Sequence, residues 1–479
     1  MRGAAGLAAT RGKADEGMTS YEATNDDFLH LDDGLPADIA RLKDAGELGR
    51  AVRLIEAELD AGTRPELAAC LRAERARLLR TPLDFSVTRE RAIAEVREEW
   101  PEFGEADLDR LIDHGRVDWR LVEGEQRFLP SFFDALRKYP EEMPGMDCPR
   151  PDRTAQLATI AEMRKAGAAE RHVHIHASIA AGDAVHVGPE TPVRCWLPLP
   201  AACPQICDVR LLDATAGVQV APTDAPQRTA YWEAAGQREF FVDYEYTIRA
   251  PYVDLWAEKP APAAADARFA PAPAPTVADV SERRPHVTFT PYLRELADRL
   301  FADIAADDQL GRARAAYDYV TKNVDYRFQP AYLLLDPIAD SCAKSLRGDC
   351  GVFALTFITL CRLGGVPARW QSGLYAAPAE VGPHDWAMFY VDGLGWMWAD
   401  CSFGSAARRD GDEQRRRFYF GNLGPWRMVA NSEFMAPLTP ACDILRNDSF
   451  DNQVGELVVD GRGLTSHDFT WKTELVSMR

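Results

Sequence analysis

The spacing of apolar residues along the chain follows two different periods. Between residues 26 and 150 apolar side chains recur every three or four positions, as in 48–59, a run that Gly62 follows. This spacing predicts amphipathic helices. From about residue 170 the period falls to two, and residues 193–200 and 240–249 alternate apolar with polar side chains. This alternation predicts half-buried antiparallel strands that form a β-sandwich.

Changes in composition divide the chain further. The N-terminal segment is rich in Gly, Ala and charged residues, and we expect it to be disordered. A later segment is rich in Ala and Pro, which is typical of a semi-rigid, extended linker. The sequence therefore predicts an α+β multidomain protein. Its expected parts are a disordered N-terminus 1–25, a helical domain 26–150, a β-sandwich domain 168–257, a linker 258–284 and a C-terminal α+β domain 285–479.

Charge and cysteine usage narrow the possible partners and the compartment. The chain has 479 residues, with 74 acidic and 55 basic side chains, and carries a net charge of −19. Such a surface repels phosphate, so we expect neither nucleic acid nor an anionic membrane as a partner. No apolar run reaches the roughly 18 residues of a membrane span, and the N-terminus lacks a secretory apolar core. The ten cysteines show no CxxC pattern. These features together predict a cytoplasmic protein.

One cysteine stands at the start of a predicted helix. Residues 352–363 carry apolar side chains on every side, which predicts a fully buried helix, and a Gly-Gly pair at 364–365 ends it. The helix begins at or near Cys350. Unpaired N–H groups and the positive end of the helix dipole stabilise a thiolate there and can bind an oxyanion. Cys361 lies about 16 Å further along the helix axis and is expected to fill the core.

A histidine that follows Cys350 opens a predicted β-hairpin. The segment HDWAMFYVDGLGWMWAD, from His384 to Asp400, contains two strands joined at an Asp-Gly pair. A two-residue turn would set Asp385 opposite Asp400, two like charges. A three-residue loop at 391–393 instead sets His384 directly opposite Asp400. We expect this loop, with Asp400 accepting a hydrogen bond from one imidazole nitrogen while the other nitrogen faces Cys350.

The sequence gives little support for a metal or a cofactor. Three histidines at 172, 174 and 176 share one face of a predicted strand. In line along a strand they span about 13 Å, so they cannot converge on one ion without a bend. Cys203 and Cys207 lack the second pair that a zinc site needs. We expect no metal and no cofactor, and we expect most cysteines to be small buried side chains.

Two motifs resemble the transglutaminase-like superfamily, a branch of the papain-like thiol enzymes. They are RGDCGVFALTFITLCRLGGVPARW, from Arg347, and the hairpin segment from His384. The family pattern is a Gly-Asp-Cys turn, a buried helix, a His-x-Trp strand and a Gly-Trp strand closing on Asp. The resemblance covers about 285–440. It implies a papain-like α+β core, preceded by a β-sandwich as in some bacterial members, with Cys350 as nucleophile, His384 as general base and acid, and Asp400 as the orienting carboxylate.

The chain departs from that pattern beside the triad. Asp385 follows the histidine where a small residue is commoner, and its charge should favour the imidazolium and move the base side of the pH optimum upward. The oxyanion-binding side chain of the family is usually Gln or Trp. Gln329 and Tyr332 are the candidates here, next to the backbone N–H of Cys350. Trp386 is the aromatic residue that we expect to line an acceptor groove, although aromatic strand residues more often pack in a core.

The resemblance implies acyl transfer through a thioester, and it leaves the acceptor open. Water as acceptor would make the protein a peptidase or amidase, and a primary amine would make it a transglutaminase. No EF-hand calcium loop is present in the sequence, and the bacterial relatives resemble hydrolases more often than cross-linkers. We therefore expect hydrolysis of a peptide, a protein or a small amide. A non-catalytic protein-binding scaffold is the remaining alternative, and the intact set of three residues argues against it.

Overall fold

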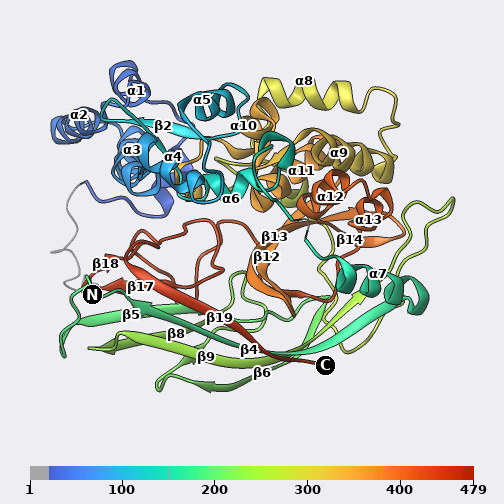
Figure 1. The fold of residues 1–479 in the computed structure, drawn as a ribbon. Coiled ribbons are helices and arrows are strands. Elements are labelled where there is room, and N and C mark those ends of the chain that lie inside the picture. Colours follow the sequence, from blue (N-terminus) through green and yellow to red (C-terminus); the bar gives the residue numbers. More distant parts are fainter. Residues whose placement is uncertain (1–20, 150) are drawn as a thin grey trace, which may run out of the picture.

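The computed structural model describes residues 21–149 and 151–479, which pack as layers (Figure 1). Helices form the upper layer, a five-stranded sheet lies beneath them, and a β-sandwich forms the base. Most of the segment 1–25, predicted to be disordered, lies outside the described residues. Its described part differs from the prediction, because Ala23 is buried and the Asn25 amide donates to the carbonyl oxygens of Cys442 and Ile444.

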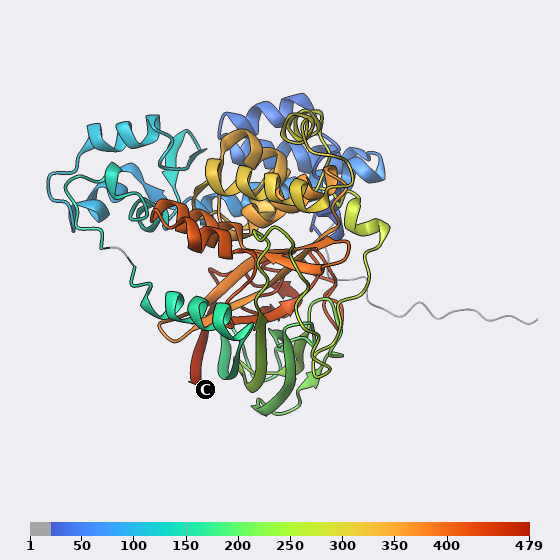
Figure 2. The same cartoon turned by 90° about the vertical axis from the view of Figure 1, so that its right-hand side faces the viewer.

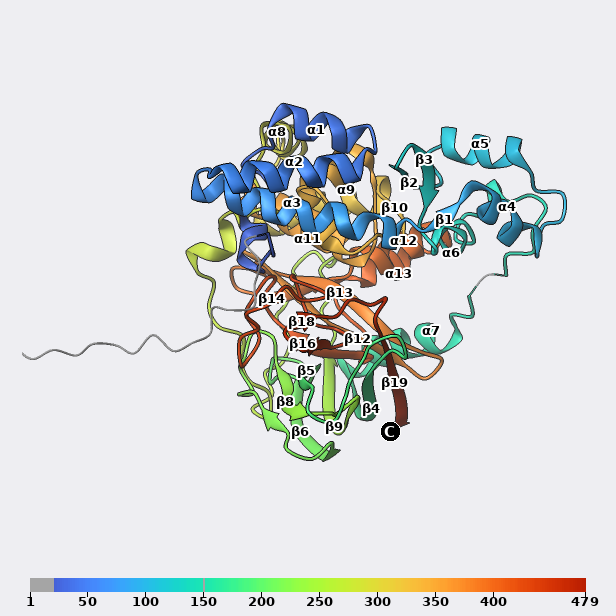
Figure 3. The same cartoon turned by 90° about the vertical axis from the view of Figure 1, so that its left-hand side faces the viewer.

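Three helices lie side by side at the start of the described chain (Figure 3). They are α1 (Ala37–Asp44), α2 (Leu48–Ala61) and α3 (Pro65–Asp84). Apolar residues at helical spacing, including Ile39, Ile55 and Leu71, form a cluster of their own. Gly62 follows α2 at a φ of +79°, a conformation that glycine adopts without strain, and Pro65 opens α3 where no N–H is needed.

The remainder of the N-terminal region combines helices with a small antiparallel sheet. Its elements are β1 (Val87–Thr88), α4 (Arg89–Arg97), α5 (Glu105–Asp113), β2 (Trp119–Val122), β3 (Glu125–Phe128) and α6 (Phe132–Leu136). They enclose a separate core and project to one side (Figures 2 and 3). The β2–β3 turn is Glu123-Gly124, both at positive φ, as a two-residue hairpin requires. The expectation of helices alone does not hold here, because strands of four residues are too short to show a period of two.

The β-sandwich follows α7 (Thr154–Ala166) and consists of two antiparallel sheets. One sheet has the order β19 (Phe469–Met478), β4 (Ala168–Ala181), β9 (Glu239–Pro251) and β6 (Ile206–Ala214). The other has the order β18 (Arg462–Gly463), β17 (Glu456–Val459), β5 (Pro192–Pro198), β8 (Thr229–Ala235) and β7 (Gln219–Val220). Alternate residues such as Val173, Ile175 and Tyr244 face the space between the sheets. This is the arrangement that a period of two produces.

The last strands of the chain belong to the β-sandwich. The predicted boundaries had instead assigned them to the C-terminal domain 285–479. β17 pairs with β5, with Val458 opposite Arg194, and β19 pairs with β4, with Trp471 opposite Ile179. The sandwich therefore consists of strands from 168–251 and 456–478. The chain enters the core from the sandwich and returns to it. Such pairing between distant segments covers the strand edges, and no local pattern in the sequence reveals it.

The core places one long helix against a central sheet. Its helices are α8 (Pro291–Leu300), α9 (Gln309–Asn323), α10 (Ile338–Ser345), α11 (Cys350–Leu363), α12 (Cys401–Arg409) and α13 (Glu413–Phe418). The sheet has the order β15 (Phe420–Gly421), β14 (Gly395–Ala399), β13 (Glu380–Val391), β12 (Ala368–Ala377) and β16 (Arg427–Asn431). A short parallel pair, β10 (Asp325–Tyr326) and β11 (Arg347–Gly348), lies before α11. None of the helices in the described ranges has the length and apolar content needed to cross a bilayer.

The two faces of the central sheet have different neighbours. Ala387 and Phe389 of β13 belong to the apolar cluster around α11, and Phe389 contacts Phe357 of that helix. Trp386 and Met388 belong to the cluster shared with the sandwich. The sheet is therefore buried on both faces, which explains why β13 reads as a continuous apolar run.

The Ala/Pro-rich segment 258–284 runs along this sheet. The Trp396 indole N–H donates to the carbonyl oxygen of Pro273 at 2.8 Å. Arg369 forms two hydrogen bonds with the Asp279 carboxylate, at 2.7 and 2.9 Å. These contacts fasten the segment to the core.

Candidate active site

Cys350 is the first residue of α11. Asp349 caps this helix, since its Oδ1 accepts a hydrogen bond from the backbone N–H of Val352 at 3.2 Å. The helix is buried from Gly351 to Cys361, whereas Cys350 is partly exposed. Cys361 is fully buried at the far end. Of the two cysteines in α11, only Cys350 is both partly exposed and at the start of the helix.

Tyr332 lies against the same helix start. Its hydroxyl donates to Asp349 Oδ1 at 2.5 Å, and a Cβ on Gly351 would stand only 2.1 Å from the hydroxyl oxygen. Glycine at 351 therefore allows the tyrosine to approach. Gln329, the other candidate for the oxyanion site, donates its amide to two backbone carbonyl oxygens of its own segment. Of the two candidates, Tyr332 is the one that touches the helix of Cys350.

His384 and Asp400 are hydrogen-bonded, with 2.8 Å between Nε2 and Oδ2. His384 lies in β13. Asp400 follows β14 and caps α12, because its Oδ1 accepts from the backbone N–H of Phe403 at 2.9 Å. Both side chains are buried. The structure thus brings together the two residues that the sequence predicted to meet.

The strand register that brings them together differs from the predicted one. Ala387 pairs with Ala399, where the predicted register would pair it with Met397. The loop occupies 392–394, and the glycines on both sides of Leu394 have positive φ. A shift of two residues keeps every side chain on its own face, so His384 and Asp400 still meet, along a diagonal. Two nearby glycines offer two turn positions, and the sequence does not distinguish them.

A further buried residue, Arg427 at the start of β16, holds Asp400. Its Nη2 lies 2.6 Å from Asp400 Oδ2, the same oxygen that contacts His384. The guanidinium also lies over the Phe403 ring, 4.8 Å from its centre. Sequence reasoning missed this residue. The available signal was a single arginine in the otherwise apolar run 426–430.

The buried charges set the ionisation states of this group. Burial alone would raise the pKa of Asp400, but His384 and Arg427 outweigh it and lower the pKa to about 2. Burial lowers the pKa of His384, and Asp400 acts in the opposite direction. An ionised carboxylate therefore faces an imidazole that is neutral at pH 7.

The thiol of Cys350 is held in its protonated form. Burial, followed by the charges of Asp385 and Asp349, raises the pKa of the thiol well above its ordinary value. A hydrogen bond from the backbone of Asp385 acts in the opposite direction without overcoming these effects. The low thiol pKa that is expected at a helix start is therefore not found for Cys350 in the resting site.

Asp385 contacts the thiol of Cys350. The Cys350 thiol donates to Asp385 Oδ2, with 3.2 Å between the two atoms, and the sulfur also has a hydrogen bond with the backbone of Asp385. Asp385 alternates with Trp386 in β13 and shares the face of Ala387, toward α11. The expectation that it would favour an imidazolium is wrong, because burial is the largest influence on His384 and lowers its pKa.

Trp386 does not line a groove. Its side chain is 1% exposed, within the cluster between the central sheet and the sandwich. The indole N–H donates to Gln371 Oε1 at 2.8 Å. This prediction failed because the sandwich covers that face of β13, and the sequence does not reveal where the sandwich docks.

A cavity of about 300 Å³ lies beside Tyr332. Its wall comes from segments that are distant in the sequence, among them α3, the segment that contains Tyr332 and the C-terminal loop. The polar residues of the wall are Arg80 and Asp84 of α3, Ser131, Gln329, Asn447, Asp448, Ser466 and His467.

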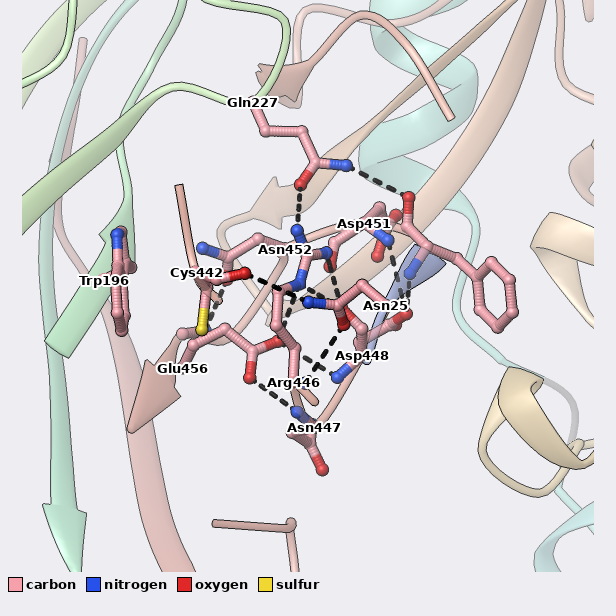
Figure 4. Close-up of polar contacts among 12 residues, drawn as sticks. Asn25, Trp196, Gln227, Cys442, Arg446, Asn447, Asp448, Asp451, Asn452 and Glu456 are labelled. Carbon is pink, nitrogen blue, oxygen red and sulfur yellow. Dashed lines mark hydrogen bonds and ion pairs between the residues drawn. The ribbon is translucent and has the colours of Figure 1, made fainter. Parts of the chain in front are cut away.

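The loop between β16 and β17 is fixed by a buried arginine (Figure 4). Arg446 donates to the backbone carbonyl oxygens of Asp448 and Asp451 and to Gln227 Oε1. Glu456 accepts from the backbone N–H groups of Asn447 and Asp448. The loop thus has a defined shape despite its lack of regular structure.

Gln453 joins this loop to the strand of the histidine. Its Nε2 donates to the carbonyl oxygen of His384 at 3.1 Å and to Asp385 Oδ1 at 2.7 Å. Asp451 also hydrogen-bonds Asp385. The loop therefore supports both residues.

The three histidines of β4 pair with carboxylates on the neighbouring strand. His172 contacts Glu245, while His174 and His176 contact Asp243. Within the residues that the structure describes, no group of three or more His, Cys, Asp or Glu side chains is arranged to hold a metal ion.

Similarity to solved structures is distant. A protein from Cytophaga hutchinsonii described as a candidate cysteine protease is 15% identical, with 65% of this chain and 91% of that chain covered and a TM-score of 0.39. The periplasmic domain of TgpA from Pseudomonas aeruginosa is 16% identical, with coverage of 54% and 96% and a TM-score of 0.25. No curated protein has a matching sequence.

The sequence itself matches one family. Residues 295–401 match the profile of the transglutaminase-like superfamily. This segment begins in α8 and ends just after Asp400, so it contains the buried helix and the hairpin described above. Residues 295–401 of this chain thus form a domain of the transglutaminase-like superfamily, and that domain carries Cys350, His384 and Asp400.

Proposed function

We propose that this protein is a cysteine-dependent acyl-transfer enzyme that cleaves an amide or peptide bond through a thioester on Cys350. The observation that carries the proposal is the buried chain His384–Asp400–Arg427, together with a partly exposed thiol at a helix start that contacts Asp385, the residue next to His384. An ionised carboxylate held by two donors does not stabilise a core that serves packing alone. Such a chain does fix the tautomer of an imidazole and stabilise its protonated form during a reaction.

The chemistry would proceed in two halves. In the first, the thiol proton moves to Nδ1 of His384, the nitrogen that does not face Asp400, and the sulfur attacks the amide carbonyl carbon. The backbone N–H of Cys350 binds the resulting oxyanion, and the imidazolium protonates the departing amine. In the second, His384 takes a proton from water and the hydroxide attacks the thioester carbon. The C–S bond breaks, the imidazolium returns the proton to the Cys350 sulfur, and the carboxylic acid is released.

Hydrolysis is the preferred outcome over transfer to an amine. The cavity beside Tyr332 supports a peptide, protein or small-amide substrate, since its wall offers many hydrogen-bonding groups. The net charge of −19 supports a role without a nucleic-acid or membrane partner. We also propose a cytoplasmic location, supported by ten cysteines that are all unpaired. Recovery of the protein in an extracellular or periplasmic fraction would contradict that location.

The test is turnover of a glutamine-containing peptide library with and without a fluorescent primary amine. Release of ammonia or of a shortened peptide, faster than incorporation of the amine, is the expected result. Faster amine incorporation would identify a transglutaminase instead. Cys350→Ser should abolish both reactions, and Cys361→Ser serves as the matched control. An absence of turnover with every substrate, together with an unreactive Cys350, would favour a protein-binding scaffold.

A further inference from the structure

We propose that Asp385 is a further catalytic residue, whose neutral carboxyl group donates a hydrogen bond to the Cys350 sulfur as the thiolate forms. The proposal rests on the thiol chemistry proposed above and adds a residue to it. Its starting point is geometric: Asp385 Oδ2 lies 3.2 Å from the sulfur, which is the atom that reacts.

The contacts of Asp385 place its proton on the oxygen that faces the sulfur. Gln453 donates to Oδ1 at 2.7 Å. The orientation of the Gln453 amide is fixed, because the same nitrogen also faces the carbonyl oxygen of His384, which can only accept. Oδ1 is therefore an acceptor, and the proton of a neutral Asp385 belongs on Oδ2. In the resting site the thiol donates to Oδ2. Once the thiol proton has moved to His384, the O–H on Oδ2 can donate to the sulfur in turn.

The surroundings of Asp385 favour its neutral form. The side chain is buried, and other carboxyl groups crowd it, so they cannot all be ionised together. Burial, and then the charge of Asp349, raise the pKa of Asp385 well above its usual range. The titratable groups that face it are Asp349 and Cys350 of α11, Asp448 and Asp451 of the C-terminal loop, Tyr326 and Tyr332, and its neighbour His384.

Two aspartates of this site are thus held in opposite states. Asp400 lies between a guanidinium and an imidazole, and its pKa is lowered to about 2. Asp385 lies among acids and beside a thiol. Separated pKa values of this kind assign separate roles: Asp400 stabilises a positive imidazole, and Asp385 stabilises a negative sulfur.

The proposed step keeps its protons in balance. The thiol proton moves to His384, the sulfur becomes negative, and the Asp385 O–H donates to it without transferring its own proton. The hydrogen bond weakens when the sulfur forms its bond to the acyl carbon. An ionised Asp385 has the opposite effect, because its charge disfavours the thiolate. The thiolate should therefore lose this support as the pH rises and Asp385 ionises.

The experiment measures the alkylation rate of Cys350 by iodoacetamide between pH 5 and 10 in the full-length protein. Mass spectrometry of the Cys350 peptide separates it from the other nine cysteines, and the partly exposed Cys148 serves as an internal reference. Asp385→Asn keeps a neutral donor, and Asp385→Leu keeps the volume without a donor. Asp392→Asn, at the exposed turn of the same hairpin, is the control for charge removal.

We expect Asp385→Asn to react within about threefold of the native rate at pH 7 and Asp385→Leu to react about tenfold slower or more. The native rate relative to Asp385→Asn should fall as the pH rises. Faster alkylation in both variants would show that Asp385 suppresses the thiolate, and equal rates in all proteins would show no role; either overturns the proposal. Alkylation needs no substrate, so this outcome is independent of whether the amide assay detects turnover.

Discussion

Arg427 and His384 bind the same oxygen of Asp400, at 2.6 Å from Nη2 and 2.8 Å from Nε2. Asp400 is wholly buried, so these two partners are what keeps it ionised. Arg427 lies outside the segment 295–401 that matches the family. The carboxylate of the proposed triad therefore depends on a residue from another strand, beyond the recognised domain.

Replacing Arg427 by methionine should weaken both stability and catalysis. Loss of the guanidinium leaves a buried carboxylate without one of its two charged partners, which costs about 3 kcal/mol in the free energy of unfolding. Urea denaturation at pH 7 measures this change. Arg417→Met, which breaks an exposed pair with Glu413, should change stability by less than about 0.5 kcal/mol. Equal effects of the two substitutions would contradict the role given to Arg427.

The free energy of unfolding should fall at acid pH because Asp400 becomes protonated there. Its folded pKa of about 2 lies below the ordinary 3.8, so the stabilisation is present above pH 4 and is lost as the pH falls toward 2. The difference corresponds to about 2 kcal/mol. Asp400→Asn should lack this acid-sensitive part in urea denaturation between pH 2 and 5. An unchanged acid dependence in the variant would mean that Asp400 is not ionised in the native state.

The fall of kcat/KM at acid pH should follow the protonation of His384. Burial lowers its pKa, so the imidazole remains an available base below pH 6.5 and activity should decline only at more acid pH. Asp400 opposes this lowering, so Asp400→Asn should move the limb to still lower pH while reducing the rate at least about a hundredfold. Amide turnover between pH 4 and 8 measures both effects. A limb above pH 6.5 would indicate a different base.

Gly351→Ala should destabilise the protein although alanine favours helices. The new methyl group would stand 2.1 Å from the Tyr332 hydroxyl oxygen, and the tyrosine can move aside only by giving up its bond to Asp349. We expect a loss of about 1 to 2 kcal/mol, against a gain of about 0.5 to 1 kcal/mol from helix propensity alone. Tyr332→Ala in the same chain should remove most of the loss.

The matched control for this substitution is Gly424→Ala, where nothing lies within 4 Å of an added Cβ. Thermal denaturation of the single and double variants is sufficient. If Gly351→Ala raised the melting temperature, the close approach of Tyr332 to the helix start would be refuted.

The features that depend on short stretches of sequence could be predicted. Cys350 opens a buried helix because apolar residues surround that helix and Asp349 can cap it. The hairpin after His384 forms around an Asp-Gly turn, and the contact with Asp400 tolerates the two-residue error in register. A two-residue shift leaves each side chain on its face, which is why the site prediction survived a wrong pairing.

The features that depend on docking between distant segments could not be predicted. Arg427 reaches Asp400 from β16, and Trp386 is buried because the sandwich covers its face of the sheet. Asp385 contacts the thiol because α11 lies on the other face. Each fact needs the relative position of two elements, and hydrophobic periodicity contains no information on that position.

The most direct test of the central claim is mass spectrometry of the protein after rapid acid quenching during amide turnover. The account predicts an acyl adduct on the Cys350 peptide that decays when substrate is exhausted, and no adduct in Cys350→Ser. Turnover by Cys350→Ser, or an adduct confined to another residue such as Cys361, would contradict it.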